Sequence, residues 1–199
     1  MSLRLAALLI CLALPVQAAP DNLALAGRLV SDLGGTDNIA RMGAQGAIKT
    51  GVIKSPDLYR KVYEQYLKDH RDLIARADAA MAAIYAQVYS ADELTGYLAY
   101  EESPVGRAIL QKQFAANESF FSSNYQPAQL TDEEKAAQTD FYASAQGKAI
   151  NRKFGQAMGT FLTEVGPYLQ QINVGAIEQY CQQGGDCSNM KIIPRASKP

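Results

Sequence analysis

Few side chains in this sequence of 199 residues are suited to acid–base chemistry at neutral pH, and His70 is the first candidate. It is the only histidine, and it stands among Asp69, Arg71 and Asp72, so a general base with carboxylates nearby could form there. The same pattern is typical of a solvated, charged edge of a helix, which is the interpretation we favour. A zinc site is not predicted, because the chain lacks the further His and Cys ligands that zinc needs.

Glu101, Glu102 and Ser103 form a second group of candidates. Adjacent residues on a helix point in different directions, so the two glutamates are poor partners for acid–base catalysis, and we interpret them as a solvated helix end. Ser103 has no Gly-x-Ser-x-Gly elbow and no histidine near it, and a helix cap is the better interpretation. Nucleotide-binding glycine loops are also missing from the sequence. We therefore predict no catalytic residue, no metal site and no cofactor.

The first 18 residues predict export. Arg4 precedes an apolar run over residues 5–14, Pro15 interrupts it, and small residues lead to Ala18. We predict a signal peptide over residues 1–18, cleaved after Ala18, and a periplasmic mature protein; an uncleaved N-terminal anchor is the alternative. No later segment approaches 18 uninterrupted apolar residues, so no membrane span is predicted in the mature chain.

Cys181 and Cys187 are the only cysteines after the predicted cleavage site, with five residues between them. In an exported protein such a pair most simply forms a disulfide, which we predict here. A redox-active pair and a two-cysteine metal site are the alternatives, and neither is favoured, because the spacing is not Cys-x-x-Cys and His70 is distant in sequence. Residues 188–199 are predicted to be a loose, basic C-terminal tail.

The composition is that of a globular protein, with 48% hydrophobic and 20% charged residues and a formal net charge of -1. This balance provides no basic field for nucleic acid, so no nucleic-acid partner is predicted. Apolar residues recur at helical spacing, and no long segment alternates as a strand would. We predict an all-α fold, a single domain over residues 19–187 with about seven helices. One of these helices is predicted to run from residue 55 to residue 89, with a bend near His70.

Local signals suggest where several helices begin and bend. Gly34-Gly35 is predicted to stop the first helix, and Thr36 to cap the second. Gly155, Gly159 and Gly166 share one face of the last predicted helix, which should kink at Gly166-Pro167. Small residues let another helix approach closely. We expect a contact within the chain on this face, with a partner site as the alternative.

Two segments resemble each other at an offset of 41 residues. Each begins with a capping box, the first at Ser90 and the second at Thr131. Eight of 32 aligned positions are identical, whereas chance gives roughly two. We therefore predict an internal repeat, with units of about 90–125 and 131–166.

Each repeat unit is predicted to be a helix, a corner and a longer helix. At the first corner Ser103 is a good N-cap and Pro104 a good first helical residue. Gly106 and its counterpart Gly147 are costly inside helices, so their presence at both corners indicates close backbone approach. The second corner keeps the serine, Ser144, but has no proline, so its helices are expected to continue with only a bend.

The segment SADELTGYLAYEESPVGRAILQKQ, residues 90–113, resembles the signature of a bacterial family known as domain of unknown function 2059. That signature combines a Ser/Thr cap, Asp/Glu-Glu-Leu, an aromatic residue, Ser-Pro-x-Gly and a helix bearing Lys or Gln. The resemblance covers about residues 82–125, and residues 25–42 resemble the segment usually found upstream. It implies an exported, mostly helical protein of Gram-negative bacteria, and it supplies no activity and no catalytic residues. This chain departs from the pattern with Tyr100-Glu101 where Phe-Tyr is common.

Tyrosines are the remaining candidates for a binding site, because the chain has 11 Tyr, 6 Phe and no Trp. Tyr63 and Tyr66 lie on one helical stripe, and Tyr97 and Tyr100 flank the first corner. An apolar ring with a polar tip suits the mouth of a groove, although packing at the rim of the core is the interpretation we favour.

The function that these observations predict is a non-catalytic binding or interaction module of the cell envelope. Its partner would be an unknown apolar or peptide-like ligand or an envelope protein. The alternative is a hydrolase whose site is assembled from residues distant in sequence. The sequence carries no signal for an oligomeric state.

Overall fold

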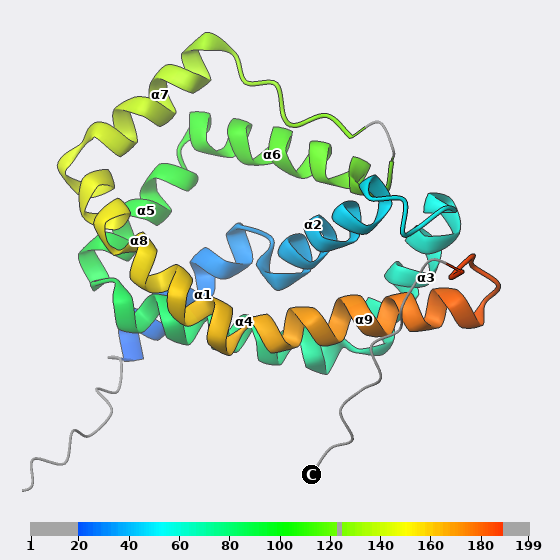
Figure 1. Cartoon of the computed structure of the whole chain (residues 1–199). Helices are drawn as coiled ribbons and strands as arrows, with labels where there is room; N and C mark the ends of the chain where they lie inside the picture. Colours follow the sequence, from blue (N-terminus) through cyan, green and yellow to red (C-terminus); the bar gives the residue numbers. More distant parts are fainter. Residues whose placement is uncertain (1–19, 123–124, 189–199) are drawn as a thin grey trace, which may run out of the picture.

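The structure is a computed structural model that describes residues 20–122 and 125–188. Every regular element in these ranges is a helix, which confirms the all-α prediction (Figure 1). The elements are α1 (Pro20–Asp32), α2 (Gly35–Lys49), α3 (Pro56–Asp69), α4 (Arg71–Val88), α5 (Ala91–Glu101), α6 (Pro104–Glu118), the 3₁₀ helix η1 (Ser119–Phe121), α7 (Asp132–Ala143), α8 (Ala145–Glu164) and α9 (Gly166–Gln182). The predicted signal peptide and residues 189–199 of the predicted tail lie outside the described residues.

The structure differs from the predicted number of about seven helices, because the described ranges hold nine α-helices. The helix predicted over residues 55–89 is divided at His70, whose backbone leaves the helical region at φ −121° and ψ 37°. The His70 ring stacks on Tyr66, and its Nδ1 lies 2.8 Å from the Tyr66 carbonyl oxygen. The last predicted helix is divided at Val165, so Gly166-Pro167 begins a new helix instead of kinking an old one. His70 is therefore a half-buried residue at a helix end.

The start of α2 also corrects a prediction. Gly34 is the residue that precedes the helix, in a left-handed conformation at φ 79°, and Thr36 lies inside the first turn. The Thr36 backbone N–H and hydroxyl both donate to Asp78 Oδ1, each over 2.7 Å. A carboxylate from α4 thus satisfies the first turn of α2, which local sequence could not show.

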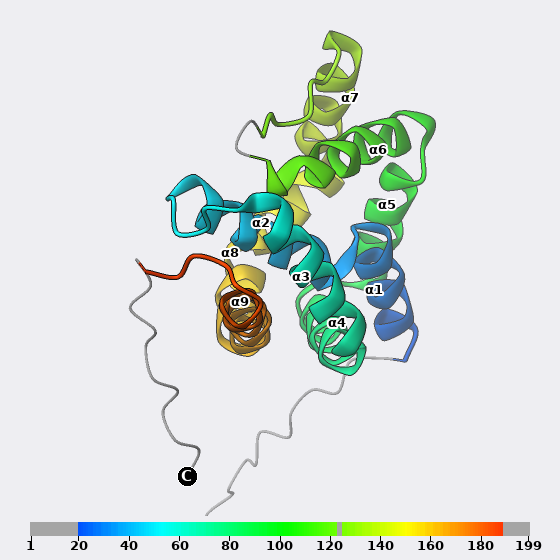
Figure 2. The same ribbon diagram turned by 90° about the vertical axis from the view of Figure 1, so that its right-hand side faces the viewer.

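Buried side chains form two clusters that meet along α9. One cluster joins α1, α4, α5 and α8, and the other joins α2, α3, α9 and η1. Tyr168 and Leu169 of α9 contact both clusters. Figure 1 shows α2 at the centre, with α6 on one side and α4 and α9 on the other, and Figure 2 shows α9 end-on with α7 far from it. Among the described helices, none is both long enough and apolar enough to cross a membrane.

Helix pairs α5–α6 and α7–α8 are each joined by a sharp corner. Ser103 and Ser144 are the N-caps of α6 and α8, and each hydroxyl oxygen accepts from the N–H of a glycine, over 3.1 Å from Gly106 and 3.0 Å from Gly147. Ser144 is extended at ψ 163°, so the second corner is a true break and our expectation of a mere bend is wrong. A serine cap alone therefore turns the chain there, without proline.

Candidate ligand-binding site

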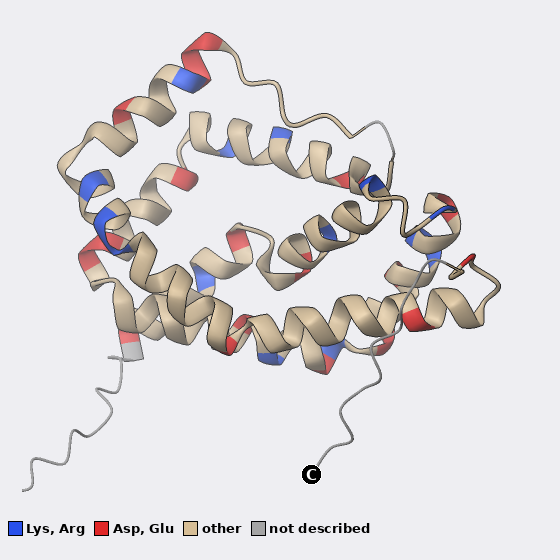
Figure 3. Ribbon diagram, viewed as in Figure 1, with Lys and Arg blue, Asp and Glu red and all other residues tan. Residues whose placement is uncertain are grey.

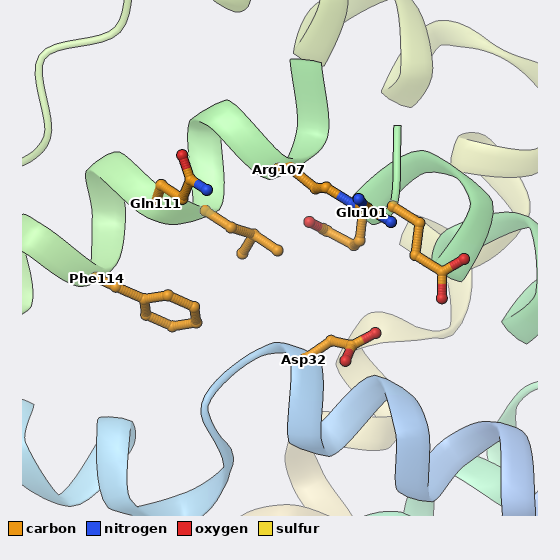
Figure 4. A pocket seen from close by; sticks show the side chains of 7 residues that line it. Asp32, Glu101, Arg107, Gln111 and Phe114 are labelled. Carbon is orange, nitrogen blue, oxygen red and sulfur yellow. The ribbon is translucent and has the colours of Figure 1, made fainter. Parts of the chain in front are cut away.

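A cavity of about 360 Å³ opens beside the first corner, between α1, α5 and α6 (Figure 4). Three carboxylates line it together with one guanidinium, one amide and two apolar side chains: Asp32, Glu101, Glu102, Arg107, Gln111, Leu110 and Phe114. Asp32 is the last residue of α1, and the glutamates end α5. The cavity thus collects residues that are up to 82 positions apart in the sequence.

The corner itself fixes how α6 faces this cavity. A side chain on Gly106 would place its Cβ 2.1 Å from the carbonyl oxygen of Tyr100, which is far inside van der Waals contact. Only glycine lets α6 start this close to the end of α5. The close approach brings Arg107, the next residue, to the same cavity as Glu101.

Glu101 is the unusual member of the lining. Its residue surface is only 7% exposed, and none of the residues that the structure describes forms a hydrogen bond or ion pair with its carboxylate. Burial, and then the nearby charge of Asp32, raise the pKa of Glu101 to about 7. Our interpretation of this residue as a solvated helix end is therefore wrong, because α1 covers it.

The other charged groups around the cavity differ from Glu101 in their exposure or in having an ion-pair partner. Glu102 forms an ion pair with Arg28 of α1, and both side chains are partly exposed. Arg107 is exposed at the rim, and no ion pair joins it to a carboxylate in the described ranges. Asp32 is half-buried at the end of α1. With one of the three carboxylates already paired, Glu101 and Asp32 are the groups available to a bound cation.

The apolar part of the lining comes from α6. Leu110 and Phe114 follow Arg107 along that helix, and Figure 4 shows Phe114 on the α6 side and Asp32 on the α1 side of the same space. An aromatic ring beside carboxylates suits a cation that carries hydrocarbon, because the ring face attracts positive charge and also covers apolar surface. The cavity can therefore hold an organic cation.

The four tyrosines predicted as binding residues lie elsewhere in the structure. Tyr63 is fully buried and Tyr66 is 7% exposed, both in the cluster around α3 and α9. Tyr97 and Tyr100 are half-buried and stack on Phe141 of α7, with ring centroids 5.9 and 4.1 Å apart. None of the four lines the cavity described above.

Tyr100 is nevertheless coupled to the cavity by charge. Burial, followed by the adjacent carboxylate of Glu101, raises the pKa of the Tyr100 hydroxyl to about 12. The structure therefore brings together Tyr97, Tyr100 and Glu101 on α5, while Tyr63 and Tyr66 belong to the other cluster.

Sequence reasoning missed Asp32, Leu110 and Phe114. The only local signal was the Glu101-Glu102 doublet beside the corner, which we set aside as solvated. The cavity depends on the packing of α1 against α5, and neither helix contains a sequence motif that predicts this contact. Among described residues, no three His, Cys, Asp or Glu are placed to hold a metal ion.

The predicted disulfide is confirmed, since Cys181 and Cys187 are joined with their Cα atoms 5.7 Å apart. Within the loop that they close, Asp186 forms an ion pair with Lys54, with Nζ 2.8 Å from Oδ2. The Lys54 ammonium and then the Ser188 hydroxyl lower the pKa of Asp186. The loop after α9 is thereby tied to the segment between α2 and α3.

Comparison with known proteins gives one family and no individual relative. No curated protein and no solved structure matches the chain. The matching segment runs from α4 through α5 and α6 to the residue after η1, and it includes the first corner and most of the cavity lining. Residues 75–122 match the sequence model of the bacterial family DUF2059, described as an uncharacterized protein conserved in bacteria, which confirms the resemblance found in the sequence.

Proposed function

We propose that the protein is a non-catalytic binding protein of the cell envelope, and that it holds an organic cation in the cavity between α1, α5 and α6. The ligand class is an aliphatic amine with an apolar part, such as a lysine side chain or the amino terminus of a peptide. One observation carries the proposal: Glu101 is a nearly buried carboxylate without a partner in the described ranges, and it lines an open cavity.

Burial disfavours the charged form of a carboxylate unless an opposite charge compensates it. In the free protein this cost appears as the raised pKa of Glu101. An ammonium group between Glu101 and Asp32 would favour the ionised form of Glu101. Leu110 and Phe114 would cover the hydrocarbon of the same ligand. The binding energy would thus have two sources: the ammonium would compensate the charge of the Glu101 carboxylate, and the hydrocarbon of the ligand would be buried against apolar side chains.

Export to the envelope is part of the proposal. Its support is the signal-peptide pattern of residues 1–18 and the Cys181–Cys187 disulfide, a bond typical of oxidising compartments. Helix α1 begins at Pro20, so cleavage after Ala18 would leave every described helix intact.

The two helix–corner–helix units are proposed to be copies of one ancestral unit. Lys112 of α6 binds the capping glutamate of α7, Glu134, over 2.6 Å. At the same offset of 41 residues, Lys153 of α8 binds the capping glutamate of α5, Glu93, over 2.5 Å. Such exchanged contacts are what two-fold related units make, which supports a duplication.

Isothermal titration calorimetry of the mature protein with n-hexylamine tests the binding proposal, with n-hexanol and n-hexanoate as matched probes. We expect only the amine to bind, with an affinity that rises from pH 6 to pH 8, because the cation favours ionised Glu101. Glu101→Gln and Asp32→Asn should each weaken binding at least tenfold, and Glu64→Gln, an exposed carboxylate on α3, should not. Equal binding of the alcohol, or unchanged affinity in Glu101→Gln, contradicts the proposal.

A hydrolase is the second candidate, and the same glutamate favours it. A carboxyl group with a pKa near 7 beside a second carboxylate is the arrangement that general acid–base catalysis uses. Ester, peptide and glycan substrates distinguish the two functions. Turnover that disappears in Glu101→Gln but survives in Glu64→Gln would establish the enzyme.

A further inference from the structure

The outward face of α8 carries three large apolar side chains. Phe154 is 54% exposed, Met158 39% and Leu162 66%, and they follow one another at intervals of four residues along the helix. Residues at this spacing lie on one face, so the three form a continuous apolar stripe. Scattered apolar residues are ordinary on surfaces, but three in register are not.

Nothing in the described part of the chain packs over the glycines beside this stripe. A Cβ placed on Gly155 or Gly159 would meet no heavy atom within 4 Å. The contact within the chain that we expected on this glycine face is therefore absent among the described residues. The buried side of α8 is the opposite one, with Ile150 and Ala157 in the core.

Positive charge lies next to the stripe. Lys148 and Arg152 are exposed in the first half of α8, and neither forms an ion pair with a described residue. No acidic residue occurs in α8 before Glu164, its last residue. Figure 3 shows the blue residues near the start of α8 and an uncharged tan stretch after them.

We propose that this face of α8 binds the surface of a membrane that contains anionic lipid. Defined by Lys148, Arg152, Phe154, Met158 and Leu162, it combines the features of an interfacial helix: cations for the headgroups and apolar side chains for the acyl boundary. The unpaired cations and the lack of a carboxylate among them favour an anionic surface over a neutral one. The glycines leave the helix backbone accessible between the apolar side chains.

Flotation of the mature protein with vesicles tests this proposal independently of the cavity. We expect binding to equimolar phosphatidylglycerol and phosphatidylcholine, and at least tenfold weaker binding to phosphatidylcholine alone or in 0.5 M salt. Leu162→Asp should weaken binding at least tenfold, and so should the double variant Lys148→Gln, Arg152→Gln. All these positions are exposed, so circular dichroism should show unchanged helix content.

Two control variants match the size of these changes at other surfaces. Met42→Asp alters an apolar side chain on α2 that is 56% exposed, and Lys61→Gln removes an exposed cation on α3. Neither should change vesicle binding. Absence of binding to anionic vesicles overturns the proposal, as does an equal loss in the controls. Concentration-dependent dimers that Leu162→Asp dissociates, without vesicle binding, would assign the face to a second copy of the chain instead.

Discussion

The ring of Tyr100 lies flat against the ring of Phe141, with centroids 4.1 Å apart and planes inclined by 10°. These two residues are 41 positions apart, the same offset that relates the two corners. In the proposed duplication Phe141 is the counterpart of Tyr100, and a residue that packs on its own counterpart lies near the axis of a two-fold arrangement. The stack, the exchanged Lys–Glu pairs and the matched glycines therefore describe one arrangement of α5–α6 against α7–α8.

Both corner glycines should resist even the smallest substitution. A Cβ would lie 2.1 Å from the Tyr100 oxygen in Gly106→Ala, and 2.2 Å from the Phe141 oxygen in Gly147→Ala. Each change should lower the free energy of unfolding by about 2 kcal/mol or more, although helix propensity alone would raise it. Urea denaturation measures the effect.

Gly155→Ala is the matched control for this prediction, because its Cβ meets open space. It should raise the free energy of unfolding by about 0.5–1 kcal/mol. If Gly106→Ala were as stabilising as the control, the corner would not need its close backbone contact.

Glu101 should make stability depend on pH. Its folded pKa of about 7 lies above the unfolded value near 4.5, so the folded state binds more protons between these values. Stability therefore falls as pH rises from about 4.5 to 7. Glu101→Gln removes this loss and should stabilise the protein at pH 8 by on the order of 2 kcal/mol, and by almost nothing at pH 4.

Thermal melts of the wild type and Glu101→Gln at both pH values check this expectation. Glu64→Gln, on the exposed side of α3, should show no such pH-dependent gain in stability. A constant difference between wild type and Glu101→Gln at all pH values would mean that Glu101 does not titrate in this range.

The Lys–Glu ion pairs between the two units should make stability depend on pH in the direction opposite to that of Glu101. Lys153 and the Ser90 backbone N–H lower the pKa of Glu93, although its partial burial opposes them. A lowered folded pKa gives stability that is present above the unfolded pKa and is lost as pH falls through the folded one. A double-mutant cycle of Glu93→Gln and Lys153→Met should give a coupling of about 0.5–1 kcal/mol at pH 7, since the lysine is partly exposed.

The same cycle at pH 2.5 should give a coupling near zero. Lys135→Met with Asp132→Asn is the reference pair, because these side chains are 62% and 102% exposed, and we expect little coupling there at either pH. Coupling between Glu93 and Lys153 that persisted in acid would exclude a charge interaction as its cause.

Three buried tyrosine hydroxyls near the disulfide end of the molecule have no hydrogen-bond partner among the described residues: those of Tyr59, Tyr63 and Tyr180. A buried polar group without a partner costs stability. Tyr63→Phe should therefore raise the free energy of unfolding by about 1 kcal/mol. Tyr97→Phe should not, because its hydroxyl is not one of the buried groups without a partner. A loss of stability in Tyr63→Phe contradicts the prediction.

The sequence allowed prediction of the features that local chemistry decides. Ser90 and Thr131 form capping boxes, Ser103 caps α6 and Gly106 meets the backbone of the preceding helix, as their residue types suggested. Each depends on groups within six residues along the chain. The disulfide belongs with them, because its two cysteines had no competing partner.

Other features depend on contacts between distant segments, and the sequence did not predict them. Helix α1 covers Glu101, although 69 positions separate that glutamate from Asp32. A pattern of apolar residues shows that a helix has a buried face, but not which helix buries it. The cavity was for that reason invisible in the sequence.

The exchanged capping glutamates have a consequence for how the molecule opens. Glu93 Oε2 accepts from its own Ser90 backbone N–H and from Lys153 of the other unit, and Glu134 does the same with Thr131 and Lys112. Fraying the first turn of either short helix releases a lysine that holds the other unit. Amide protons of α5 and α7 should therefore exchange with deuterium at one common opening free energy, as a single cooperative element.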